Sequence, residues 1–232
     1  MQIVIALYDR FSALDAVGPH QVLAHVPGAE IIFASERARA VSDETGTLTL
    51  VADASYADVP APDILLVPGG PGQSAQMGDT PLRDWIIEAD KTSMWTTSVC
   101  TGALILAAAG LLDGRQATTY WLAMNELAAL GAKPVHDRYV FDGKYATSAG
   151  VSAGIDMALA LAARLTDDDT AQAIQLGIEY APNPPYDAGS PTTAPPGLVA
   201  AQRAASRFPN PLRSPRGHQS HRAPPSGSHM DA

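Results

Sequence analysis

The sequence predicts an α/β fold with a mainly parallel sheet that helices cover on both faces. Two observations predict it: strand-like and helix-like segments alternate along the chain, and several strand-like segments are continuous apolar runs. Hydrophobic residues make up 46% of the 232 residues but aromatic residues only 6%, so small aliphatic side chains must form the core. Sites in such sheets lie at the carboxyl ends of strands, and reactive side chains are expected there.

Short runs of branched apolar residues predict four buried strands. They lie at 2–8, 30–36, 63–68 and 94–99. Pro19 predicts the first turn of a helix that runs to about His25, because proline suits that position. Thr45-Gly46 lies between two runs of alternating polarity, which predicts a hairpin. Further helices are expected at 81–91 and 101–110.

The second half of the chain predicts three more helices, at 121–130, 152–165 and 168–180. Gly131 suits the residue that follows the first of them. Asp142-Gly143 is typical of a two-residue hairpin turn, here between strands at 135–141 and 144–147.

The composition changes after Tyr180, because 181–232 holds 11 of the 19 prolines. We expect one domain at 1–204, ending in an ordered extended arm at 181–204, and a disordered tail rich in proline and arginine at 205–232. Five arginines and one aspartate give 203–232 a charge of +4. Because the net charge of the whole chain is −9, residues 1–202 carry −13. So acidic a domain argues against nucleic-acid binding.

The cysteine count and the N-terminus indicate the compartment. A single cysteine, Cys100, excludes an intramolecular disulfide and a cysteine-based zinc site within one chain. The N-terminus MQIVIALYDR lacks the cationic start of a signal peptide. No apolar run reaches the ~18 residues that cross a bilayer. We expect a cytoplasmic protein without a membrane segment.

The most informative stretch is MWTTSVCTGA at 94–103, where a strand ends, Cys100 occupies the turn and a helix begins. This pattern is typical of a nucleophile elbow. The positive end of the helix is expected to favour the Cys100 thiolate, and nearby amides to stabilise a developing anion. The alternative is a buried, unreactive core cysteine.

Two other strand ends carry candidate groups. Asp15, after the first strand, is flanked by apolar residues, and burial would favour its neutral form, which suits a proton donor. It is equally typical of a helix N-cap. Gly69-Gly70-Pro71-Gly72, after the third strand, leaves amides open for an anion, or forms a plain tight turn.

Tyr120, Trp121 and Gly150 are candidate walls of the pocket, although all three also fit ordinary structural positions. Histidine is scarce: only His20, His25 and His136 precede the tail, and Thr101 follows the cysteine. A nucleophile with a carboxyl partner and no local imidazole argues against protease or amidase chemistry.

Four stretches resemble the ThiJ/PfpI superfamily. They are LDAVGP (14–19), LLVPGGPG (65–72), TSVCTGALILAAAGLLDGRQATT (97–119) and TSAGVSAGID (147–156). The resemblance covers about residues 1–204 and implies a flavodoxin-like three-layer sandwich with a cysteine at a nucleophile elbow. More narrowly, the sequence is similar to the isonitrile hydratase branch, above all in QLGIEYAPNPPYDAGSP at 175–191.

By position, the resemblance implies that Cys100 is the nucleophile and Asp15 the general acid and base. It makes Thr101 a polar helper at the elbow and Gly70 an amide donor near the thiolate. One departure is Tyr120, where many relatives have histidine, so details of the substrate pocket do not carry over.

The resemblance further implies a homodimer and hydration of an isonitrile to an N-substituted formamide, with no metal and no organic cofactor. Two alternatives use the same fold. One is a glyoxalase-like thiol hydratase, and the other is a non-enzymatic sensor of a ligand or an oxidant.

Overall fold

The computed structural model describes residues 1–208, and its core is a seven-stranded sheet. The strands follow the order β10-β11-β7-β6-β1-β2-β5, and all run parallel except β10. Their bounds are β1 Gln2–Ala6, β2 Glu30–Ser35, β5 Ala54–Ser55, β6 Ile64–Val67, β7 Trp95–Val99, β10 Tyr139–Asp142 and β11 Tyr145–Ser148. The four expected apolar strands form the interior of this sheet; Ile64–Val67 is buried at every position.

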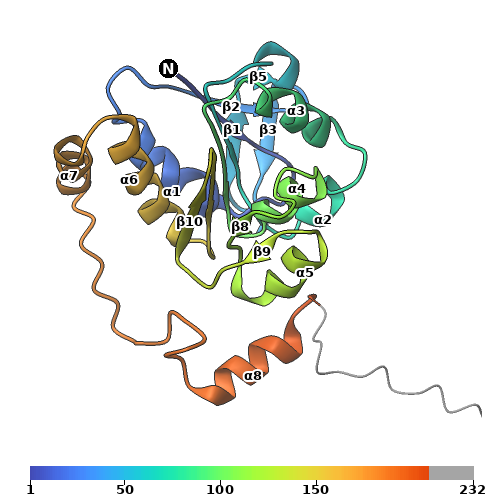
Figure 1. Cartoon of the computed structure of the whole chain (residues 1–232), viewed down its shortest axis with the longest axis vertical. Coiled ribbons are helices and arrows are strands. Elements are labelled where there is room, and N and C mark those ends of the chain that lie inside the picture. Colours follow the sequence, from blue (N-terminus) through green and yellow to red (C-terminus); the bar gives the residue numbers. More distant parts are fainter. Residues whose placement is uncertain (209–232) are drawn as a thin grey trace, which may run out of the picture.

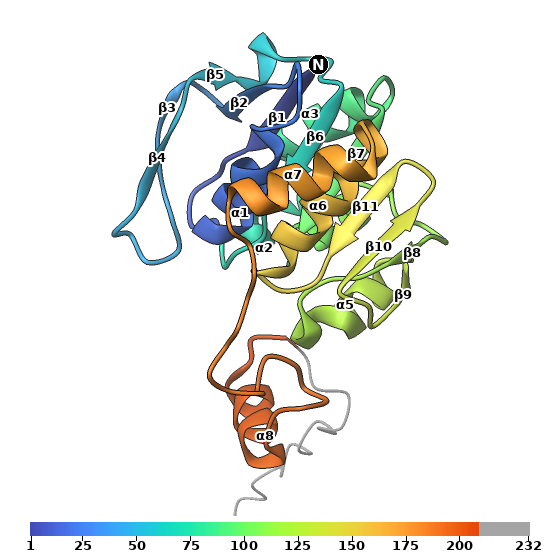
Figure 2. The ribbon, with the colours of Figure 1, turned by 90° about the vertical axis from the view of Figure 1, so that its left-hand side faces the viewer.

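Helices cover both faces of the sheet, which makes three layers (Figures 1 and 2). One face carries α1 Ala13–Leu23, α6 Ala153–Leu165 and α7 Asp168–Gly177. The other carries α2 Gln73–Gln76, α3 Pro81–Asp90, α4 Gly102–Ala108 and α5 Met124–Ala129. The expected α/β fold, a flavodoxin-like sandwich with a mainly parallel sheet, is confirmed.

Two small sheets complete the domain. The hairpin expected around Thr45-Gly46 is present as β3 Arg39–Ser42 and β4 Thr49–Ala52. A parallel pair, β8 Gln116–Ala117 and β9 Lys133–Pro134, was not expected. Single 3-10 turns at Tyr56–Asp58 (η1) and Trp121–Ala123 (η2) precede α3 and α5 along the chain.

The first helix differs from expectation. α1 begins at Ala13, so Pro19 lies inside it rather than in its first turn. Proline lacks the N–H that would bond to the carbonyl four residues earlier, but that loss did not end the helix here. The longer α1 places Asp15 in its first turn, close to the end of β1.

Two other boundaries also differ. The last hairpin begins at Tyr139 and turns at Gly143-Lys144, because Asp142 pairs with Tyr145. The arm at 181–204 is not extended throughout, since α8 occupies Pro196–Ala205 and lies apart from the sandwich (Figures 1 and 2). Most of the predicted tail, 209–232, lies outside the described residues.

Within residues 1–208, no helix is long and apolar enough to cross a membrane.

Candidate active site

Cys100 lies at the turn between β7 and α4, and its backbone has a positive φ of 55°. An L-residue rarely adopts this conformation, and such strain persists only where the surrounding structure holds it. The Cys100 N–H donates to the carbonyls of Ser148 and Ala149, both at 3.1 Å. The Thr119 hydroxyl donates to the Cys100 carbonyl at 2.7 Å. These bonds hold the sharp turn that the sequence predicted.

Gly102 explains how α4 can start so close to the sheet. A Cβ at this position would lie 2.1 Å from the carbonyl oxygen of Val67 in β6. Only glycine leaves room for that approach. Gly102, two residues after the cysteine, therefore allows α4 to pack closely against β6.

Asp15 lies beside Cys100 and has no exposed surface. It is the third residue of α1 and is not the N-cap, which is Ser12. One carboxylate oxygen, Oδ2, accepts the Gly69 N–H at 2.9 Å, and the Cys100 thiol lies close enough to lower the pKa of the carboxyl group. The other oxygen, Oδ1, has no hydrogen-bond partner within the described chain.

Burial raises the pKa of Asp15 to about 7, and the charge of Glu44 adds to this rise. The Gly69 N–H and the Cys100 thiol act in the opposite direction. A buried carboxyl with an unpaired oxygen favours its neutral form. The expectation that Asp15 can hold a proton near neutral pH agrees with this environment.

Cys100 is only 5% exposed. Burial has the largest effect on the pKa of its thiol and raises it, and the charge of Asp15 raises it further. Hydrogen bonds from the amides of Val151 and Thr101 and from the Thr101 hydroxyl lower it. This differs from the expectation of a favoured thiolate, because burial and a neighbouring carboxylate outweigh the helix terminus. When Asp15 holds a proton, its charge no longer opposes a thiolate at Cys100, and only burial does.

The glycine loop after β6 packs against both groups. The Gly70 N–H donates to the Thr101 hydroxyl oxygen at 3.0 Å, so Thr101 links this loop to the elbow. A Cβ on Gly69 would lie 2.5 Å from the Thr101 nitrogen and 2.9 Å from Asp15 Oδ2. Glycine is therefore required at position 69 so that the loop can approach Asp15 and the elbow. A plain tight turn would not require this close approach.

The three candidate wall residues lie together on the Cys100 side of β11. A Cβ on Gly150 would lie 3.0 Å from the Tyr120 ring, and Tyr120 and Trp121 make an edge contact with centroids 6.1 Å apart. Burial raises the pKa of Tyr120, and the charge of Cys100 raises it further. The Tyr120 hydroxyl is therefore close enough to Cys100 for their charges to interact. His20, in contrast, stacks on Phe33, with centroids 5.3 Å apart.

Sequence reasoning missed Tyr8, Glu44 and Arg207, whereas Val151 belongs to the turn of the candidate wall residue Gly150. Tyr8 donates its hydroxyl to the Pro68 carbonyl at 2.7 Å, and Glu44 accepts the Ser12 hydroxyl at 2.7 Å. Val151, at a φ of 35°, directs its amide to the sulfur, and Arg207 bonds to the glycine loop. Tyr8 follows a strand end, which is a usable signal, but Glu44 and Arg207 come from distant segments with no local signal.

The described part of the chain holds no group of three or more His, Cys, Asp or Glu side chains that could bind a metal. The groups that the candidate site presents are a thiol, a carboxyl group, hydroxyls and backbone amides.

Comparisons with known proteins agree with this site. Residues 1–164 match the model of the DJ-1/PfpI family. An isonitrile hydratase of Pseudomonas putida is 44% identical over 207 residues, which cover 88% of this chain and 90% of that protein. A crystal structure of a ThiJ/PfpI family protein from Pseudomonas syringae superposes with a TM-score of 0.85 at 36% identity, covering 88% of this chain and 84% of that one. Drosophila melanogaster DJ-1beta shares the fold, with a TM-score of 0.71 at 22% identity over 78% of this chain and 98% of that one.

Proposed function

Because this chain belongs to the DJ-1/PfpI family, we propose that it is an isonitrile hydratase, a lyase that converts R–NC to an N-substituted formamide. The observation that carries the proposal is the buried pair of Cys100 and Asp15 at the carboxyl ends of β7 and β1. The 44% identity to the Pseudomonas putida isonitrile hydratase supports the choice of substrate.

The reaction starts from a pair that holds one proton. Proton transfer from the Cys100 thiol to Asp15 gives a thiolate beside a neutral carboxyl group. Their titrations are coupled, so this proton belongs to the pair rather than to either residue. The amides of Thr101 and Val151 stabilise the thiolate while it exists.

The terminal carbon of an isonitrile accepts both a nucleophile and a proton. The Cys100 sulfur bonds to that carbon while Asp15 delivers its proton there, which gives the thioimidate R–N=CH–S–Cys. Asp15 is then a carboxylate and takes a proton from water, whose oxygen adds to the same carbon, and Asp15 passes that proton to the nitrogen. In the collapse of R–NH–CH(OH)–S–Cys the C–S bond breaks and the hydroxyl proton is transferred to the sulfur, which gives R–NH–CHO and returns the thiol beside the Asp15 carboxylate. The overall change is the addition of one water, so no metal, organic cofactor or external oxidant is needed.

The other candidate residues have supporting roles in this scheme. Thr101 fixes the Gly70 peptide at the elbow, and Gly70 supplies an amide beside the sulfur once the Thr101 hydroxyl releases it. Tyr120, Trp121 and Gly150 form the wall that receives the R group. We also propose that the functional unit is a homodimer and that 1–204 forms the catalytic domain.

The first test is formation of N-cyclohexylformamide from cyclohexyl isocyanide, measured by chromatography. We expect turnover by the wild type, none by Cys100→Ala, and a loss of about 10²–10⁴-fold in Asp15→Asn, the usual range for a general acid and base. Asp84→Asn is the matched control, because Asp84 also lies in the first turn of a helix but is exposed.

Three results would contradict the proposal. Turnover retained in Cys100→Ala would exclude the covalent scheme. No formamide from the wild type, together with lactate from methylglyoxal, would favour a glyoxalase-like hydratase. Cys100 that reacts with peroxide but turns over neither compound would indicate a sensor.

A further inference from the structure

The last described residues of the chain return to the candidate active site. Arg207 lies 137 residues from Gly70 in sequence, yet its Nη2 donates to the Gly70 carbonyl at 3.1 Å. The same guanidinium donates to the Pro71 carbonyl at 3.1 Å and to Gln73 Oε1 at 2.9 Å. Three acceptors on one loop make full use of the planar fork of an arginine. The arm is thus joined to the loop that packs on Thr101.

Neighbouring residues fix this end of the arm. Phe208 is 9% exposed and belongs to the same cluster of buried apolar side chains as the core. The Arg207 guanidinium lies 4.7 Å from the centroid of the Phe208 ring, so the loop and the ring both contact it. A buried aromatic residue next to a multiply bonded arginine is typical of a docked segment rather than a loose end.

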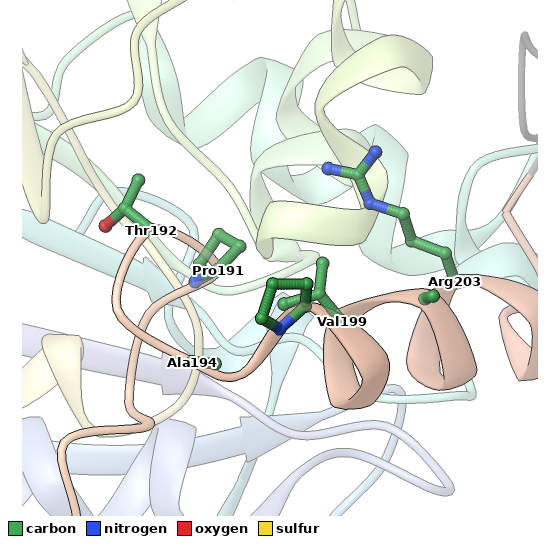
Figure 3. Close-up of a pocket in the computed structure, with 7 residues that line it drawn as sticks. Pro191, Thr192, Ala194, Val199 and Arg203 are labelled. Carbon is green, nitrogen blue, oxygen red and sulfur yellow. The ribbon is translucent and has the colours of Figure 1, made fainter.

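Arg203 makes a second contact from α8, one helical turn earlier. Its guanidinium carbon lies 5.7 Å from the centroid of the Trp121 ring, within the range of a cation–π contact. Figure 3 shows Arg203 beside an open pocket on the arm, which it lines together with Pro191, Thr192 and Val199. None of the candidate site residues named from the sequence lines this pocket.

The two arginines contact two segments that border the candidate site. Arg207 bonds to the Gly70 loop, which in turn bonds to Thr101, and Arg203 lies over Trp121, which contacts Tyr120. Thr101 follows Cys100 in the chain, and the charge of Cys100 acts on the Tyr120 hydroxyl. Both contacted segments therefore lie near Cys100, which is only 5% exposed.

We propose that residues 203–208 form a clasp that closes the mouth of the candidate active site, with Arg207 as a positioning residue for the Gly70 loop. The clasp would restrict the size of R groups that reach Cys100. The clasp proposal rests on the proposed function only for the identity of the substrate, because access to the Cys100 thiol can be measured without an isonitrile.

The experiment uses the single cysteine of the full chain. The rates of Cys100 modification by a small reagent, iodoacetamide, and a bulky one, fluorescein-5-maleimide, are compared in the wild type, Arg207→Ala, Arg207→Lys and Arg37→Ala. Arg37 is the matched control, because it is an exposed arginine on another part of the surface.

We expect Arg207→Ala to raise the ratio of the bulky rate to the small rate at least about tenfold and Arg37→Ala to leave it unchanged. Arg207→Lys should give an intermediate ratio, since lysine keeps the charge but not the planar fork. Arg203→Ala should also raise the ratio, so this variant tests the clasp if Arg207→Ala does not fold. A ratio within twofold of the wild type in folded Arg207→Ala or Arg203→Ala would overturn the clasp.

The isonitrile reaction gives a separate measurement. Arg207→Ala should change KM for cyclohexyl isocyanide more than for methyl isocyanide. If the wild type turns over neither compound, the proposed function fails while the alkylation ratios still decide the clasp.

Discussion

At the scale of residues, Cys100 and Asp15 form one acid–base unit rather than two separate groups. Burial disfavours the charged form of each group, and the charge of Asp15 further disfavours a charge on Cys100. A buried pair of this kind keeps one proton over a wide pH range, because the second ionisation would bring two negative charges together. The scheme needs this one-proton state, since it holds both a nucleophile and an acid.

The pH dependence of activity follows from that state. Below the raised pKa of Asp15, at about 7, the pair holds two protons and the thiol does not attack. We therefore expect kcat/KM for formamide production to rise with pH through about 7 and then to level off. Glu44→Gln removes a negative charge that raises the pKa of Asp15, so the rising limb should move to lower pH. The measurement is the pH profile of both proteins.

Glu88→Gln is the matched control for this profile, because Glu88 is exposed on α3 and pairs with Lys91. Its rising limb should coincide with that of the wild type. A limb that stays in place in Glu44→Gln, or moves to higher pH, would contradict the assignment of that limb to Asp15.

At the scale of elements, the close approach of α4 to β6 decides where the sulfur lies. Gly102→Ala would place a Cβ 2.1 Å from the Val67 carbonyl oxygen, and backbone cannot give way as a flexible side chain can. We expect a loss of unfolding free energy of about 3 kcal/mol, at the upper end for overpacked cores. Chemical denaturation followed by circular dichroism measures it.

Gly177→Ala is the control for Gly102→Ala, because Gly177 also lies in a helix and a Cβ there would meet nothing within 4 Å. Alanine should leave stability unchanged or raise it by up to about 1 kcal/mol, the propensity difference between the two residues. Equal effects of the two substitutions would show that α4 can shift outward and that the close approach is not required.

The elements also show what the sequence could and could not predict. Cys100 and Asp15 were found because each follows a strand, and parallel strands bring their ends to one edge. The start of α1 was wrong because Pro19 was taken as a start signal, although Ser12 and Asp15 suit a start as well. α8 was missed because the proline-rich composition hid it, yet Pro196 occupies N1, where its missing N–H has no partner to lose.

Contacts between distant segments could not be predicted at all. Glu44 reaches Ser12 from a hairpin, and Arg207 reaches Gly70 from the end of the arm. Nothing in either local sequence specifies its partner, because the fold alone brings the two segments together.

At the scale of the whole molecule, charge and apolar surface are divided unevenly. Residues 1–202 carry −13, whereas Arg203 and Arg207 bring positive charge onto that acidic domain. The apolar side chains of the C-terminal part are exposed: Leu176 by 81%, Tyr186 by 79% and Leu198 by 57%. No residue of α8 is buried. A row of exposed apolar residues along one segment is typical of a surface that another chain covers.

We expect a second copy of the chain to cover this segment, in agreement with the proposed homodimer. Light scattering after size exclusion should give twice the mass of the chain for the wild type. Leu198→Glu should shift the population toward the monomer, because a carboxylate would be buried without a partner in the interface. Val51→Glu is the control, since Val51 is 60% exposed on β4, in a different part of the molecule. A monomeric wild type, or a dimer that only Val51→Glu weakens, would show that the arm is not the interface.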